Sequence, residues 1–207
     1  MRYFLSILLI FTAITFATGC GTQKPSTFST VTQSFNADRY EKQVLYYINK
    51  VRQNPKRFYN QYVENYIKEN SDDFTSYYTK SLRKRLLNQQ PLPPFQKSNT
   101  LQSITLKQLH YLTHKLKGRK LTHKQGSISF SERIKGSNLH RFAENLYRAT
   151  KNSALEVVLD LLIDQNVRSL GHRKNILNKN YKLINIQSAK ASNGYIVTVM
   201  DFGSKKE

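Results

Sequence analysis

Hydrophobic residues recur every three or four positions over several long stretches, and this spacing predicts amphipathic helices. The clearest case follows Ser153, where apolar residues of 154–162 share one face and Glu156 stands at the third position of a capping box. The same spacing predicts three further helices, over residues 37–52, 56–67 and 98–117.

Two later segments alternate between apolar and polar residues, as strands do. They cover residues 183–189 and 195–202, and Asn193-Gly194 between them is a strong hairpin signal. Shorter alternation over 127–131 predicts a short strand, whereas the polar, basic segment 70–94 ends in Pro-Leu-Pro-Pro and predicts a loop or insertion with a short helix. Helices first and a hairpin last predict an α+β fold with a largely antiparallel sheet.

The N-terminus has the pattern of an export signal. Arg2 precedes a largely apolar run over 4–16, which is too short for a membrane span and has the proportions of a secretory signal. The run ends in Ala17-Thr18-Gly19-Cys20, which resembles the bacterial lipobox, and Cys20 is the single cysteine. We therefore expect a signal peptide over 1–19, a lipidated Cys20 with a flexible tether over 20–36, and a folded domain over 37–204; an ordinary signal peptide with a chance cysteine is the alternative.

Charge changes the picture of possible partners. The 207 residues carry 33 Lys and Arg against 13 Asp and Glu, a formal net charge of +20, and no Asp or Glu occurs between Phe74 and Ser131. Such a surface attracts anionic lipid, acidic glycans or other polyanions, although it is more often simply the solvated surface of a basic protein. Since no RNA-binding motif or Cys/His zinc finger accompanies it, the sequence gives no support for a nucleic-acid partner. The oligomeric state is left open.

Four short motifs occur in an order that resembles the CAP superfamily, which includes cysteine-rich secretory, antigen-five and pathogenesis-related proteins. They are Asn49-x-x-Arg52-x-x-Pro55, Ala143-Glu144-Asn145-Leu146, Gly171-His172 and Asp201-Phe202-Gly203. The resemblance extends over about residues 40–203 and is to the bacterial branch that lacks disulfides.

This resemblance implies an α-β-α sandwich whose central cleft holds two histidines and two acidic residues. The corresponding positions are His123, Glu144, His172 and Asp164, the last of these by its place at the end of the helix before the loop. Two imidazoles and two carboxylates suit zinc or another divalent metal. The alternative is a buried network in which these polar groups satisfy one another. Arg133 has two candidate ion-pair partners, Glu132 and Glu144.

We therefore expect an exported protein, lipid-anchored to the bacterial cell envelope, that acts as a binding or interaction module with a candidate metal site in its cleft. The choice of membrane and leaflet is open, and so is the partner, with anionic lipid, glycan and host protein as candidates. One alternative is a metal-dependent hydrolase acting on envelope polymers or peptides, although Cys20 is assigned to the anchor and no Ser lies in a Gly-x-Ser-x-Gly elbow. Another is an anionic lipid or polymer binder that uses the basic surface. The sequence leaves open whether the protein is an enzyme.

Overall fold

A four-stranded sheet forms the middle of the molecule. The computed structural model describes residues 34–205, and within them the strands lie in the order β1-β3-β4-β2. β1 is parallel to β3, and the other two pairings are antiparallel, so the expected largely antiparallel sheet is confirmed. The strands are β1 (Gln96–Lys97), β2 (Leu139–Ala149), β3 (Leu183–Lys190) and β4 (Ile196–Lys205).

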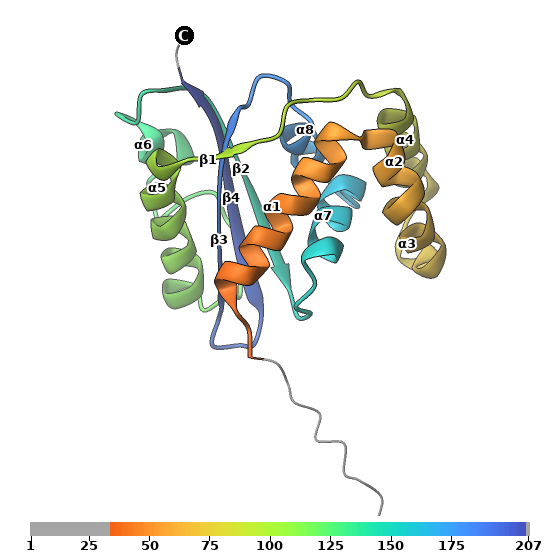
Figure 1. Ribbon diagram of the computed structural model, residues 1–207. Coiled ribbons are helices and arrows are strands. Elements are labelled where there is room, and N and C mark those ends of the chain that lie inside the picture. Colours follow the sequence, from red (N-terminus) through yellow and green to blue (C-terminus); the bar gives the residue numbers. More distant parts are fainter. Residues whose placement is uncertain (1–33, 206–207) are drawn as a thin grey trace, which may run out of the picture. The chain divides into compact units, whose positions relative to one another are not determined.

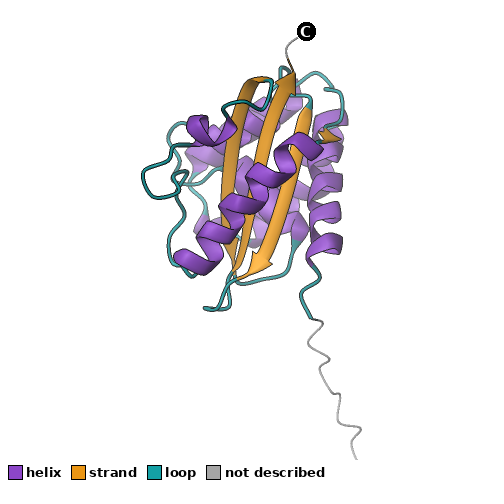
Figure 2. Ribbon diagram, turned by 90° about the vertical axis from the view of Figure 1, so that its left-hand side faces the viewer, coloured by secondary structure: helices purple, strands orange, loops and turns teal. Residues whose placement is uncertain are grey.

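Helices cover both faces of this sheet, which gives the expected α-β-α sandwich (Figures 1 and 2). One face carries α5 (Asn99–His110), the π-helical turn η3 (Tyr111–Lys115) and α6 (Phe130–Ile134). The other carries α1 (Ala37–Gln53), α7 (Ala154–Ile163) and α8 (Gly171–Ile176). Beyond α1 and α7 lie α2 (Pro55–Phe58), η1 (Tyr59–Val63), α3 (Glu64–Glu69), η2 (Ser71–Asp73) and α4 (Ser76–Asn88).

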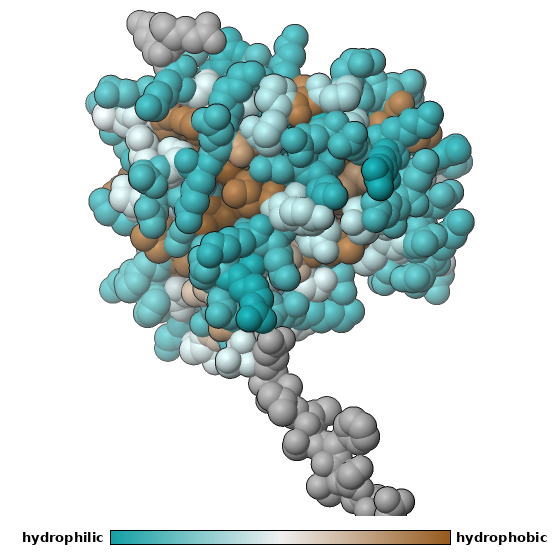
Figure 3. All heavy atoms as spheres, in the orientation of Figure 1, coloured by the Kyte–Doolittle hydropathy of each residue, from teal (hydrophilic) through white to brown (hydrophobic). Residues whose placement is uncertain are grey.

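The hydrophobic core is divided by the sheet into two clusters. The larger cluster combines residues of the sheet with buried residues of α1, α7 and α4. The smaller cluster includes Leu109 of α5 and Leu112 of η3. Alternation along β4 supplies both, since Val197 and Val199 belong to the smaller cluster while Met200 belongs to the larger. Figure 3 shows that the outer surface on the side of Figure 1 is mostly hydrophilic, with hydrophobic side chains gathered toward its centre.

The first helix follows the sequence prediction closely. Asn36 caps α1 by accepting a hydrogen bond from Arg39 N at 2.9 Å. Near its end, Arg52 is fully buried against the ring of Phe95 and donates hydrogen bonds to the carbonyl groups of Pro93, Ile176, Asn178 and Tyr181. Burial lowers the pKa of Arg52 to about 10. Arg52 thus ties α1 to the segments that follow α4 and α8.

Two sequence predictions need correction. Residues 127–131 were expected to form a strand, but Ser129 caps α6 in a complete capping box with Glu132, and only an isolated bridge joins Gln125 to Ile128. Residues 70–94 were expected to be a loop or insertion with a short helix, but the helix that they contain, α4, is 13 residues long. Its buried residues Tyr78, Leu82 and Leu86 are four positions apart, so this helix packs on the core despite its basic outer face.

The expected hairpin of β3 and β4 is present, and the sheet also contains β2, a strand that the sequence did not predict. Gly194 has a φ of 86°, in the left-handed region that the turn between β3 and β4 requires. β2 pairs with β4 and forms the outer edge of the sheet.

The predictions for the signal peptide, for Cys20 and for most of the tether concern residues 1–33, which lie outside the described part of the chain. Among the helices of residues 34–205, none has the length and apolar character needed to cross a membrane.

Candidate functional site

His123 and Glu144 form the first of two histidine–carboxylate pairs. His123 lies in the loop between η3 and α6, and Glu144 lies on β2. Nδ1 of His123 is 2.8 Å from Oε1 of Glu144. The His123 side chain is 56% exposed whereas that of Glu144 is 1% exposed. A buried carboxylate thus orients an imidazole at the surface.

The second oxygen of Glu144 is used by Arg133. Nη2 of Arg133, on α6, is 2.7 Å from Oε2 of Glu144 and also donates to the carbonyl group of His123 at 3.1 Å. Of the two partners that the sequence left open for Arg133, the structure selects Glu144. Glu132 is instead bonded to Ser129 in the capping box of α6. Both oxygens of Glu144 therefore accept hydrogen bonds from protein groups.

His172 and Asp164 form the second pair. Asp164 ends α7 with a left-handed φ of 61°, which turns the chain toward α8. Its Oδ1 is 2.7 Å from Nδ1 of His172, and its Oδ2 accepts from Arg173 N at 3.2 Å. The Asp164 side chain is fully buried and that of His172 is 25% exposed. Both oxygens of Asp164 therefore accept hydrogen bonds from protein groups as well.

Arg173, next to His172, fixes the position of α8. Its buried guanidinium donates to the carbonyl groups of Leu162, Ile163 and Tyr78 and to the hydroxyl of Ser81. Burial lowers the pKa of Arg173 to about 10. The residue after His172 therefore connects α8 with α7 and α4, so that His172 has a firmly held backbone.

Asn145 links the two pairs through β2. Its Nδ2 donates to the carbonyl group of His172 at 3.2 Å, and its Oδ1 accepts from Asn175 Nδ2 at 2.8 Å. Because Asn145 directly follows Glu144 on the strand, the two side chains point to opposite faces of the sheet. The Asn145 side chain contacts α8, while Glu144 contacts Arg133 on α6.

The packing of the neighbouring residues agrees with this division. Leu146 belongs to the core cluster under α5, the face of Glu144. Ala143 and Tyr147 pack against the cluster that contains α1 and α7, the face of Asn145. The two histidine–carboxylate pairs thus contact opposite faces of β2, and β2 is the edge strand.

Asp201 is a buried acidic group that the sequence analysis did not single out as a site residue. It is the cross-strand partner of Glu144, and its Oδ2 is 2.9 Å from Oγ1 of Thr105. Burial and the neighbouring charge of Glu144 raise the pKa of Asp201 well above its ordinary value. The available signal was an acidic residue at a core-facing position of an otherwise apolar strand.

A cavity of about 400 Å³ lies beside the second pair, and both Asp164 and His172 line it. Asp160 also lines it and accepts hydrogen bonds from the hydroxyl groups of Tyr66, at 2.8 Å, and Tyr147. Burial and the Asp160 carboxylate raise the pKa of both tyrosines. Both hydroxyls therefore remain protonated donors that hold Asp160 in place.

The four residues expected in one cleft are therefore brought together as two pairs. Within residues 34–205, no three His, Cys, Asp or Glu side chains are grouped closely enough to hold one metal ion. Glu144 and Asp164 each hold one histidine and accept a second hydrogen bond from the protein, an arrangement typical of carboxylates that orient metal-ligating histidines. A metal bound through the histidines stays a prediction.

No protein-family model and no curated protein matches the chain. Among solved structures, the chain is similar to an outer surface protein of Borrelia burgdorferi, with 22% identity, coverage of 63% of this chain and 90% of that one, and a TM-score of 0.45. It is similar to an extracellular protein of Bacillus anthracis with an SCP domain, with 13% identity, coverage of 65% and 41%, and a TM-score of 0.44. A venom allergen-like protein of Schistosoma mansoni gives 12% identity, coverage of 81% and 90%, and a TM-score of 0.46.

Proposed function

We propose that this protein is an exported, lipid-anchored interaction module of the cell envelope, in which His123 and His172 bind a divalent metal ion. The observation that carries this proposal is that each histidine has its Nδ1 against a buried carboxylate. In this arrangement the carboxylate fixes the ring and its tautomer, and Nε2 is left as the ligand atom.

The same geometry gives the two carboxylates an orienting role. Both oxygens of Glu144 accept from His123 and Arg133, and both oxygens of Asp164 accept from His172 and the backbone of Arg173. We therefore assign the two carboxylates to orienting the histidines.

A divalent ion would supply a positive charge with open coordination positions for an oxygen or nitrogen ligand of a partner. His123 and His172 are its proposed protein ligands, with Glu144 and Asp164 orienting them. Because the two pairs contact opposite faces of β2, an ion that contacts both histidines would have to lie at the outer edge of this strand.

The anchor is proposed from the sequence. Cys20 follows the N-terminal apolar run directly, and residues 20–36 connect it to the first helix of the folded domain. Two acyl chains on Cys20 would give stable membrane attachment, since a single chain alone binds only weakly.

Metabolic labelling tests the anchor. Cells that express the full chain are given radiolabelled palmitate, and the Cys20→Ala variant is the comparison. We expect label and membrane fractionation only with Cys20 present. Equal labelling of the variant, or no labelling of either chain, would contradict the anchor.

Nitrogen NMR tests the histidines. On addition of zinc, we expect Nε2 of His123 and His172 to shift, while the exposed pair His110 and His114 on α5 and η3 serves as the internal control. Shifts confined to His110 and His114 would contradict the proposed site.

A further inference from the structure

Two cavities lie beside the C-terminal end of α4. The first, of about 680 Å³, lies between α4 and the helical segment that begins with α2. The second, of about 1080 Å³, lies between α4 and the segment of α8 and the loop that follows it. Gln89 lines both. We call the two cavities together the α4 groove.

The α4 groove is lined by basic residues and by no acidic ones. Lys56 and Arg57 line the first cavity. The second contains Lys84 and Arg85 of α4 and Lys174 and Lys179 from α8 and the loop after it, and neither cavity contains an Asp or a Glu. Two segments about ninety positions apart in sequence, at 84–85 and 174–179, thus supply one positive field.

These six basic side chains are available to an external anion. None of the ion pairs formed within residues 34–205 includes any of them. Arg173 also lines the second cavity, but its guanidinium is already bonded to carbonyl and hydroxyl groups of the protein. The exposed Lys and Arg residues, and not Arg173, therefore define the charge of the groove.

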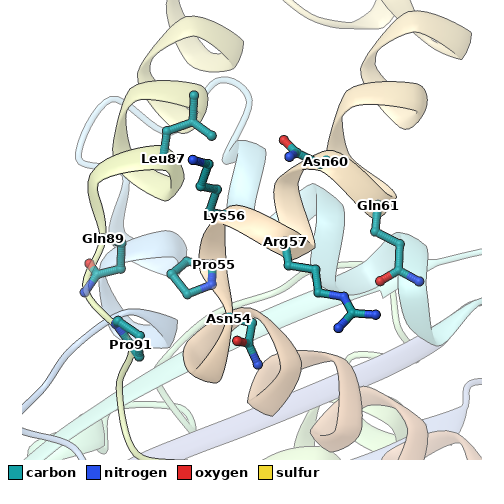
Figure 4. Close-up of a pocket in the computed structure, with 9 residues that line it drawn as sticks. All are labelled: Asn54, Pro55, Lys56, Arg57, Asn60, Gln61, Leu87, Gln89 and Pro91. Atoms are coloured by element: carbon teal, nitrogen blue, oxygen red, sulfur yellow. The ribbon is translucent and has the colours of Figure 1, made fainter.

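The remaining walls of the groove are rich in amide side chains. Asn54, Asn60, Gln61 and Gln89 line the first cavity, and Asn88, Gln90, Asn178 and Asn180 line the second. Figure 4 shows the Lys56 side chain extending toward Leu87 of α4, with Asn60 on the same helical segment as Lys56. Each amide offers both donors and an acceptor, which suits hydroxyl groups. Charges and amides in one groove fit a ligand that carries both anions and hydroxyls.

We propose that the α4 groove binds an acidic glycan, a chain of sugar units that bears repeated carboxylate or sulfate groups. Nucleic acid fits less well, because none of the residues that line the two cavities is aromatic and single strands are bound largely by stacking on aromatic rings. A lipid surface fits less well too, because the basic groups lie along a hollow and not on a flat face. None of His123, Glu144, Asp164 and His172 lines the groove, so this proposal is independent of the metal.

Fluorescence polarisation tests the groove with the full chain purified in detergent. The probe is a labelled chondroitin sulfate octasaccharide, and a neutral dextran of similar length is the reference. One variant combines Lys84→Gln, Lys174→Gln and Lys179→Gln. The matched control combines Lys107→Gln, Lys115→Gln and Lys120→Gln, which removes three exposed charges from α5, η3 and the following loop, on the other side of the sheet.

We expect the groove variant to lose at least tenfold in affinity for the sulfated probe and the control to stay within twofold of the unaltered chain. Equal losses in the two variants would overturn the proposal, since net charge alone would then explain binding. Equal binding of dextran and the sulfated probe would also overturn it. So would preferential, groove-dependent binding to vesicles containing phosphatidylglycerol. Circular dichroism of each variant shows whether a loss reflects unfolding, and the single variant Lys179→Gln in the loop provides a milder form of the same test.

Discussion

Glu144 and Asn145 are consecutive residues of β2 whose side chains hold the two histidine–carboxylate pairs on opposite faces of the sheet. Glu144 binds His123 directly, and Asn145 binds the carbonyl group of His172. Because β2 is an edge strand, both pairs contact the strand at the edge of the sheet. β2 therefore contacts both pairs, while α7 and α8 supply Asp164 and His172.

The buried ion pair between Arg133 and Glu144 predicts a non-additive mutant cycle. Both side chains are at most 5% exposed, so removing one partner leaves an unpaired polar or charged group. We expect Arg133→Met to lower the free energy of unfolding by about 3 kcal/mol. The double variant Arg133→Met/Glu144→Met should lose clearly less than the sum of the single variants in urea denaturation. An additive cycle would show that the pair is not coupled.

Asn145 is expected to stabilise the contact between β2 and α8. Asn145→Ala removes two hydrogen bonds at a fully buried position, and we expect it to cost about 2 kcal/mol of unfolding free energy. The exposed Asn65→Ala on α3 is the matched control and should change stability little. Chemical denaturation measures both. Equal stability of the two variants would contradict this role.

Glu41 gives a pH-dependent prediction. It lies on α1 and accepts a hydrogen bond from Ser188 N on β3 at 2.6 Å, and burial raises its pKa from 4.5 to about 7. Between pH 4.5 and 7 the folded protein thus binds more protons at Glu41 than the unfolded chain does. The contribution of Glu41 to stability therefore falls as the pH rises through this window.

Glu41→Gln keeps an acceptor for Ser188 but carries no charge. We expect it to be about 1–2 kcal/mol more stable than the unaltered chain at pH 8, after allowance for solvent screening, and to show no such gain at pH 4.5. The exposed Glu69→Gln on α3 is the control. Thermal unfolding of both variants at pH 4.5 and pH 8 measures the difference in stability. An equal gain at the two pH values would contradict the raised pKa of Glu41.

The two carboxylates should affect metal affinity through the histidines that they orient. We expect Glu144→Gln and Asp164→Asn each to weaken zinc binding by about 10- to 100-fold. Asp160→Asn is the matched control, because Asp160 bonds Tyr66 and Tyr147 and neither histidine. Competition with a fluorescent zinc chelator measures all three affinities. A loss of equal size in the Asp160 variant would point to a general effect of negative charge.

The sequence was sufficient for the elements whose signals are local. The helix after Ser153 begins where the cap predicts, with Ser153 Oγ accepting from Glu156 N at 3.3 Å. The hairpin between β3 and β4 turns at Gly194, as its glycine signal predicts. Both signals consist of a few adjacent residues with defined backbone preferences.

β2 was not predicted, because its burial does not alternate. Glu144, Asn145 and Leu146 are all buried, since the strand is covered on both faces where these residues lie. Two of the three are polar and find partners on other elements. A pattern of that kind has no apolar periodicity from which a strand could be recognised.

The site was predicted in part. The motifs indicated His123, Glu144, His172 and Asp164, and the structure places each carboxylate against one of the histidines. The division into two pairs follows from tertiary contacts and from the alternation of β2, neither of which the motifs contain. The proximity of Asp201 to Glu144 follows from strand register, which the sequence did not specify.

The most direct test of the proposed function is a calorimetric titration with zinc at fixed pH. It uses soluble protein starting at residue 28 and compares the unaltered sequence with His123→Ala/His172→Ala, while circular dichroism verifies that both are folded. The account predicts zinc binding by the unaltered protein and none by the folded double variant. Equal zinc affinity of the two proteins, or no binding by either, would contradict it.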